Sequence, residues 1–214
     1  MSSDRKPAVE IKKMPEEKQR ISLRERNKLR TRQEIQSAAL EVFQEAGFVG
    51  SSVDKIAKVA GTSKGTIYVY FPDGLDDIYR EIYVNLSDKL LVAGQEKRDA
   101  CSDPIQRILA LAEALLELSA QSEFGRFYNL LSPAMRPVLA PVLGRASKEF
   151  IVLISADIEA VYSDEKVEPR IFAELFTGAI REAAKIVSET PRSKGALLEG
   201  LEALISGLQT SSKK

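Results

Sequence analysis

Two short apolar-periodic segments joined by a glycine-containing turn constrain the fold of this chain more than any other feature. In the first segment, Val53 to Ala60, apolar residues recur at i, i+3, i+4 and i+7, and Gly61 ends the pattern. Either Thr62 or Ser63 can cap a second helix, which we expect to run to about Tyr70. Two short helices around such a turn predict a helix-turn-helix unit.

A longer helix precedes this unit. From Ile35 to Ala46 the apolar residues recur with a helical period, and Gly47 is placed to end the helix. Ser51 and Asp54 have the spacing of a capping box at the start of the next helix. Residues 1–21 are polar, charged and interrupted by two prolines, so we expect a disordered tail there.

Packing accounts for the apolar residues of the second short helix, because Ile67 and Phe71 are placed to point into a three-helix core. The remaining residues offer hydroxyl and amine donors and aromatic edges, which are groups that contact phosphates and base edges. These residues are Thr62, Ser63, Lys64, Thr66, Tyr68, Val69 and Tyr70. The pattern therefore favours a DNA-binding surface.

The formal net charge of zero hides an uneven distribution. Residues 1–75 carry 14 Lys and Arg against 10 Asp and Glu, whereas residues 76–214 carry 17 against 21. The excess of basic residues is concentrated in residues 20–32, RISLRERNKLRTR. Such a run suits the binding of a polyanion and is equally typical of a solvated helix start.

Several classes of chemistry are excluded by composition. The chain has no histidine and one cysteine, so neither a Ser-His-Asp or Cys-His nucleophile nor a His-rich metal site can form. It has no phosphate-binding glycine loop and no apolar run that approaches a membrane span. We expect a cytoplasmic protein that is not an enzyme, uses no cofactor and has no membrane partner.

The block TRQEIQSAALEVFQEAGFVGSSVDKIAKVAGTSKGTIYVYF, residues 31–71, resembles the N-terminal DNA-binding domain of TetR-family transcriptional regulators over roughly 40 positions without a gap. The positions that carry the resemblance are Ile35, Ala38, Ala39, Phe43, Gly47, Phe48, Ser52, Val53, Ile56, Ala57, Ala60, Gly61, Ser63, Gly65, Thr66, Tyr68 and Phe71.

Three positions depart from the family pattern. Ser52 replaces the more usual threonine, and Val69 stands where histidine or an aromatic residue is common. After Phe71 the chain reads PDGLDDI and lacks the lysine that relatives place near the start of the fourth helix. We expect Asp73 and Asp76 to act there as a cap and a first-turn acid.

The resemblance implies an all-α protein with a helix-turn-helix DNA-binding domain at residues 22–73 and a helical regulatory and dimerisation domain at residues 74–214. It implies a homodimer on a pseudo-palindromic double-stranded operator, most simply a repressor released by a small apolar or amphipathic effector. The alternative is a DNA-bound interaction protein whose C-terminal domain binds a protein partner and no small ligand. Together with the basic run at residues 20–32, the resemblance predicts phosphate or base contacts. The predicted contact residues are Arg26, Lys28, Arg30, Arg32, Ser52, Thr62, Ser63, Lys64, Thr66, Tyr68, Val69 and Tyr70.

Two further surfaces are predicted in the regulatory domain. An aromatic stripe, together with one residue from a later helix, is either a ligand pocket or ordinary core. These residues are Phe124, Phe127, Tyr128, Leu131 and Phe150. The wide apolar stripes of the last two helices predict a dimer interface, with an intramolecular bundle as the alternative. The residues assigned to it are Phe172, Phe176, Ala179, Ala183, Leu201, Ile205 and Leu208.

Overall fold

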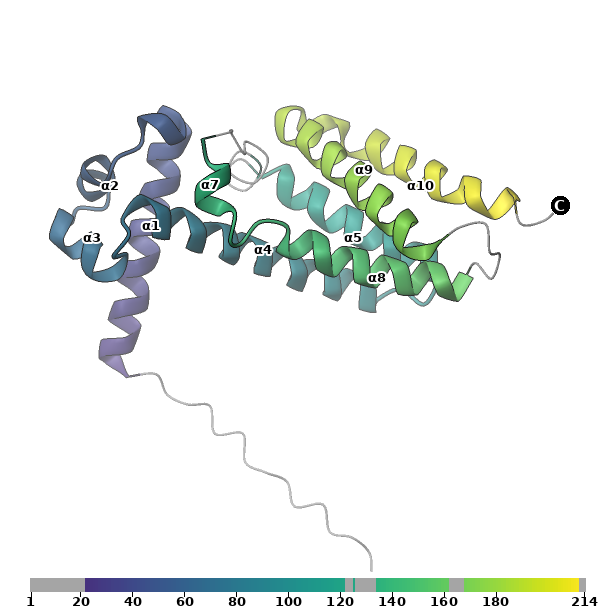
Figure 1. Cartoon of the computed structure of the whole chain (residues 1–214), viewed down its shortest axis with the longest axis horizontal. Coiled ribbons are helices and arrows are strands. Elements are labelled where there is room, and N and C mark those ends of the chain that lie inside the picture. Colours follow the sequence, from purple (N-terminus) through teal and green to yellow (C-terminus); the bar gives the residue numbers. More distant parts are fainter. Residues whose placement is uncertain (1–21, 122–124, 126–133, 162–167, 212–214) are drawn as a thin grey trace, which may run out of the picture.

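The computed structural model of the 214-residue chain describes residues 22–121, 125, 134–161 and 168–211, and every regular element among them is a helix (Figure 1). The predicted tail at residues 1–21 lies outside this range. The elements are α1 (Leu23–Gly50), α2 (Val53–Val59), α3 (Lys64–Tyr70), α4 (Leu75–Asp99), α5 (Pro104–Ser119), α7 (Arg136–Leu139), α8 (Arg145–Val161), α9 (Pro169–Glu189), the 3₁₀ turn η1 (Pro191–Ser193) and α10 (Lys194–Ser211).

Helix α1 confirms the predicted apolar stripe, because Ile35, Val42 and Phe43 are buried on one side of it. Regular helical geometry stops at Gly47, whose φ of 66° lies in the region that glycine tolerates best. The helix begins at Leu23, where the Ser22 side chain accepts a hydrogen bond from the Glu25 N–H. The first three turns of α1 therefore precede its buried stripe and extend past α3 (Figure 1).

The two short helices of the helix-turn-helix unit have the predicted bounds, with Gly61 at φ 63° in the turn between them. One cap differs from the prediction, because Ser52 rather than Ser51 accepts the hydrogen bond from the Lys55 N–H. The Ser51 hydroxyl instead accepts a hydrogen bond from Tyr79 on α4, at 2.8 Å. A tertiary contact thus determines which of the two adjacent serines caps α2.

Helix α4 begins within the core of the helix-turn-helix unit. Ile78 and Tyr79 are fully buried, and the Tyr79 ring lies 6.0 Å from Phe43 and 5.6 Å from Phe48, measured between ring centroids. Burial raises the pKa of Tyr79, which keeps its hydroxyl protonated as the donor to Ser51. The first turns of α4 thus complete the core of the predicted DNA-binding domain, although the predicted boundary at residue 73 precedes them.

The start of α4 also differs from the prediction, because Gly74 occupies the cap position in place of Asp73. The Asp77 carboxylate accepts a hydrogen bond from the Asp73 N–H, while Asp76 and Asp77 lie in the first turn as acids. The Arg80 guanidinium lies within 3.6 Å of all three carboxylates and donates to the carbonyl of Val138, at 2.9 Å. Arg80 therefore links the start of α4 to α7.

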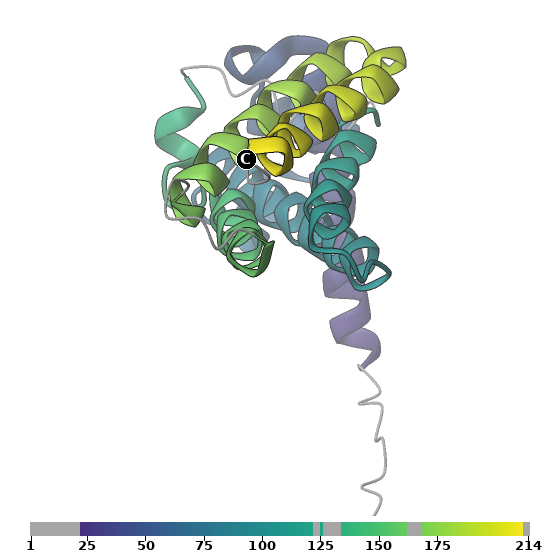
Figure 2. The ribbon, with the colours of Figure 1, turned by 90° about the vertical axis from the view of Figure 1, so that its right-hand side faces the viewer.

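The helices after α3 form a bundle in which α5 contacts α4, α8 and α9, and α10 packs against α5 and α9 (Figure 2). Asp157 on α8 is buried and pairs with Arg98 of α4 at 3.0 Å and with Arg107 of α5 at 2.7 Å. Among the described helices, none is long and apolar enough to cross a bilayer.

Of the predicted pocket residues, only Phe150 belongs to the described part of the chain. Its side chain is 2% exposed and packs beside Gly94, where an added Cβ would lie 3.6 Å from the ring. Phe150 is thus a core residue at the close approach of α8 to α4. The other predicted pocket residues, Phe124, Phe127, Tyr128 and Leu131, lie outside the described residues.

Four of the dimer residues predicted on α9 and α10 require correction, and the other three stay a prediction. Phe176, Ala183, Leu201 and Ile205 are buried inside a single protomer, and Phe172 and Ala179 are half-buried. The side chain of Leu208 lies outside the described part of the chain. The exposed large apolar residues of these helices, among those described, are Ile171 (59%), Leu175 (70%), Ile186 (40%) and Leu204 (62%). The helical period identified the stripes but not which edge of each stripe faces the protomer's own bundle.

Candidate nucleic-acid interface

The outward face of α3 consists of side chains that make few contacts within the domain. Lys64 and Tyr68 are exposed one turn apart, and Val69 beside them is 78% exposed, whereas Ile67 on the opposite face is fully buried. Of the other predicted contact residues in this segment, Ser63 is exposed, and Thr62, Thr66 and Tyr70 are half-buried. The helix thus presents a narrow strip with one cation, one phenol and one aliphatic group.

The hydroxyl groups near the turn also stabilise the helix start. The Ser63 hydroxyl accepts a hydrogen bond from the Thr66 N–H at 3.0 Å and lies 2.8 Å from the Thr66 hydroxyl. Ser52 has the same capping role at α2 and is half-buried. These hydroxyl groups therefore have a structural function whether or not they also contact a ligand.

Lys64 forms an ion pair with Asp54, in the first turn of α2, with 2.9 Å between the ammonium nitrogen and a carboxylate oxygen. Hydrogen bonding to this carboxylate raises the pKa of Lys64. Both side chains are more than half exposed. Asp54 was not among the predicted contact residues, because an acid in the first turn of a helix is sufficiently explained by the helix dipole.

The basic side chains of α1 fall on different faces of the helix. Arg24, Lys28 and Thr31, spaced i, i+4 and i+7, border a groove of about 990 Å³ whose other wall includes Val69 and Tyr70 of α3. We call this the α1–α3 groove; its lining is Ser22, Leu23, Arg24, Glu25, Asn27, Lys28, Thr31, Val69 and Tyr70. Only Lys28, Val69 and Tyr70 were predicted as DNA contacts.

The other predicted arginines of α1 do not line this groove. Arg30 is exposed and lies 3.5 Å from the carboxylate of Glu34, one turn along the helix. Arg26 is exposed as well. The helical phase relative to the buried residue Ile35 could have separated these faces, but the sequence does not show where α3 lies beside α1.

Arg32 binds a carboxylate within the protein, and this finding corrects the prediction that Arg32 contacts a DNA phosphate. Its guanidinium donates through Nε and Nη2 to Glu81 of α4, with Nε 2.6 Å and 2.8 Å from the two carboxylate oxygens. The same guanidinium lies 4.7 Å from the centre of the Phe71 ring, and hydrogen bonding to Glu81 raises the pKa of Arg32. Arg32 therefore holds α4 against α1.

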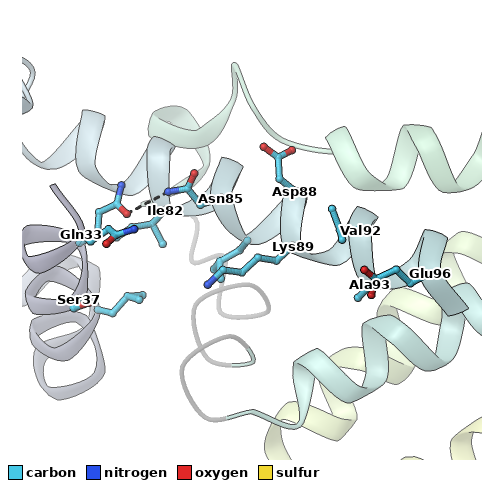
Figure 3. Close-up of a pocket in the computed structure, with 12 residues that line it drawn as sticks. Gln33, Ser37, Ile82, Asn85, Asp88, Lys89, Val92, Ala93 and Glu96 are labelled. Atoms are coloured by element: carbon cyan, nitrogen blue, oxygen red, sulfur yellow. Dashed lines mark hydrogen bonds between the residues drawn. The ribbon is translucent and has the colours of Figure 1, made fainter. Parts of the chain in front are cut away.

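Amide side chains extend this contact along α4. The Gln36 amide donates to Glu81 at 2.8 Å and accepts from the amide of Asn85 at 3.2 Å. Beyond Asn85, a groove of about 800 Å³ separates α1 from the outer face of α4, bordered by Asp88, Lys89 and Glu96 (Figure 3). Polar contacts thus join α1 to α4 near Glu81, and the two helices diverge farther along.

The comparisons with known proteins agree with this geometry. Residues 35–82, from the first buried residue of α1 to the second turn of α4, match the model for bacterial regulatory proteins of the tetR family. The HTH-type transcriptional regulator LmrA of Bacillus subtilis is 33% identical over 91 residues, which cover 42% of this chain and 47% of that protein. This part of the chain is thus similar in sequence to the N-terminal domain of TetR-family regulators.

Solved structures extend the likeness in fold beyond the first domain. The fatty acid degradation regulator FadR of Bacillus halodurans has a TM-score of 0.70 at 20% identity, over 81% of this chain and 93% of that one. FadR of Bacillus subtilis, solved in complex with stearoyl-CoA, has a TM-score of 0.66 at 20% identity, over 79% and 96%. At the sequence level the chain matches less than half the length of its curated relatives.

The Arg32–Glu81 contact predicts a loss of stability that the exposed arginines do not share. Arg32→Ala should lower the free energy of unfolding by about 2 kcal/mol, because it leaves a half-buried carboxylate without its charged donor. Arg30→Ala, which removes a more exposed pair on the same helix, should cost less than about 1 kcal/mol. Urea denaturation monitored by circular dichroism measures both values. Equal losses would contradict the structural role of Arg32.

Proposed function

We propose that this protein is a sequence-specific DNA-binding transcriptional regulator of the TetR family, acting as a homodimeric repressor that a small-molecule effector releases from its operator. One observation carries the proposal: the exposed strip of α3 lies beside a groove bordered by Arg24 and Lys28. A projecting helix beside a cationic groove is an arrangement that fits a duplex, with side chains toward the bases and cations toward the backbone.

In the proposed complex, α3 enters the major groove and one DNA backbone passes through the α1–α3 groove. Lys64, Thr66 and Val69 face the bases, where an ammonium suits guanine and methyl groups suit the thymine methyl. Arg24 and Lys28 approach phosphates from α1, and the hydroxyls of Ser52 and Tyr68 remain predicted phosphate contacts. Two such units about 34 to 36 Å apart would read successive major grooves on one face of the duplex.

The proposed dimer surface is the outward edge of α9 and α10. Ile171, Leu175 and Leu204 are exposed there, and Gly178 and Gly200 have open space where a side chain would stand. A large side chain beside a small residue lets helices of two protomers approach closely and bury apolar surface. Two helices from each protomer would then form a four-helix interface across a two-fold axis.

The effector is proposed to be a small apolar or amphipathic molecule bound in the regulatory domain. Support comes from FadR of Bacillus subtilis, which has the same fold and was solved with stearoyl-CoA. A bound effector can change DNA affinity only if it favours a different relation between the two DNA-binding domains. Helix α4 offers a path for this coupling, because it packs against α1 at one end and against α5 and α8 along its length.

Selection from random DNA tests the proposed function. The full chain should enrich duplexes that contain two related half-sites, with centres about 10 base pairs or a multiple of a helical turn apart. The selected duplex should bind at least about 10³-fold more tightly than an unrelated duplex of the same length. Recovery of random sequences, with equal affinity for both duplexes, would contradict sequence-specific regulation.

The two faces of α1 predict different salt dependences. Arg24→Ala and Lys28→Ala should each reduce the slope of log K against log salt by about 1, because each removes one phosphate contact from the α1–α3 groove. Arg30→Ala carries the same charge change on the other face of the helix and should leave the slope nearly unchanged. If all three variants lowered the slope equally, the effect would reflect net charge rather than the groove.

A charge on the outward edge of α9 should separate the protomers. Leu175→Glu should weaken dimerisation roughly a hundredfold or more, because the two-fold axis buries two unpaired carboxylates at once. The monomer should keep its helical content and lose the operator complex. Val152→Glu, at an equally exposed apolar position on α8, is the matched control. Sedimentation velocity decides between the outcomes, and a Leu175→Glu dimer would place the interface elsewhere.

A further inference from the structure

The ion pair between Asp54 and Lys64 joins the first turn of α2 to the first residue of α3, at the edge of the outward strip. We propose that Asp54 is a specificity-determining residue, which acts with Lys64 as a single donor–acceptor unit that reads one G·C base pair of the operator. This inference rests on the proposed binding of an operator by α3. It adds an acidic residue to a surface for which only cations, hydroxyls and apolar groups were predicted.

The spacing of the ion pair matches the major-groove edge of a G·C pair. Guanine O6 accepts the hydrogen bond that cytosine N4 donates, so these two atoms lie about 2.9 Å apart. The Lys64 ammonium nitrogen and the Asp54 carboxylate oxygen are also 2.9 Å apart. The ammonium can donate to guanine O6 while the carboxylate accepts from cytosine N4, and the ion pair itself stays intact.

An A·T pair fits the same unit less well. Across the major groove, G·C presents two adjacent acceptors and then a donor, whereas A·T presents an acceptor, a donor, an acceptor and a methyl group. A carboxylate placed on adenine N6 would lie beside the N7 acceptor, and an ammonium on thymine O4 would lie beside the methyl group. One of the two charged groups would then lose water without gaining a complete set of partners.

Asp54 also changes what Lys64 does on DNA of the wrong sequence. A free lysine contacts any nearby phosphate and so strengthens binding to every duplex. The carboxylate neutralises this ammonium and is itself repelled by phosphates. Hydrogen bonding to Asp54 raises the pKa of Lys64, so the ion pair favours the ammonium form. Asp54 is therefore expected to lower non-specific affinity while it preserves affinity for the operator.

The test combines Asp54→Ala, Lys64→Ala and the double variant in the full chain. Selection from random DNA gives the consensus of each protein, and titration of an unrelated duplex at several salt concentrations gives the slope of non-specific binding. Asp54→Ala should steepen this slope by about 1, because Lys64 becomes free to contact a phosphate. It should also relax the preference for one G·C pair. In the Lys64→Ala background, Asp54→Ala should leave the slope nearly unchanged, because no ammonium is freed to contact a phosphate.

Two further variants keep the result interpretable. Asp88→Ala breaks another ion pair of 2.9 Å, with Arg145, far from α3, and should leave consensus and slope as in the wild type. Asp54→Asn retains an acceptor for cytosine N4 without the charge, so it should steepen the slope and keep more of the base preference than alanine does. Thermal unfolding of each variant checks that the domain is intact.

The outcomes separate this inference from the proposed function. If the wild-type protein selects no consensus, operator binding itself is wrong. If the wild type selects a consensus but Asp54→Ala, still folded, gives the same consensus and the same salt slope, only the reading by Asp54 is overturned. A uniform loss of affinity for all duplexes, with an unchanged consensus, would likewise assign Asp54 a purely structural role.

Discussion

The packing of α4 against α1 is the contact on which the rest of this structure depends. Glu81 accepts hydrogen bonds from Arg32 and Gln36 of α1, and two residues earlier the buried Tyr79 donates to Ser51. Without these contacts, the helix-turn-helix unit would be a small three-helix domain connected to the bundle only by the chain itself. With them, one helix belongs to the cores of both domains, so the orientation of α3 is determined relative to α9 and α10.

The elements of this fold could be predicted from the sequence because they depend on local signals. Apolar residues at helical spacing predicted α1 and α2, and glycines with positive φ lie where the regular part of α1 stops, at Gly47, and just after α2, at Gly61. Ser63 caps α3, as one of the two predicted candidates. The sequence offers two adjacent serines, Ser51 and Ser52, as possible caps of α2. A tertiary contact distinguishes them, because Tyr79 donates a hydrogen bond to Ser51 while Ser52 caps the helix.

The candidate site could be predicted in part, for the same reason. The outward strip of α3 follows from its own period, since Ile67 must be buried and Lys64, Tyr68 and Val69 then cannot be. The roles of the arginines do not follow in this way. Arg24 and Arg32 are chemically alike, and only the positions of α3 and Glu81 around α1 distinguish them. A wide apolar stripe has the same ambiguity, which is why Phe176, Ala183, Leu201 and Ile205, expected between protomers, are buried within one.

The C-terminal part of α4 is held in the bundle by ion pairs to one buried carboxylate. Asp157, nearly inaccessible to solvent, receives Arg98 of α4 and Arg107 of α5, and two guanidinium groups on one carboxylate make a costly contact to break. The 18 residues from Glu81 to Arg98 form a continuous stretch of helix about 25 Å long between this contact and α1. If α4 tilted by about 5° about Asp157, its Glu81 end would move by about 2 Å. A small change of tilt at the bundle would therefore produce a larger displacement where α4 joins α1, beside the helix-turn-helix unit.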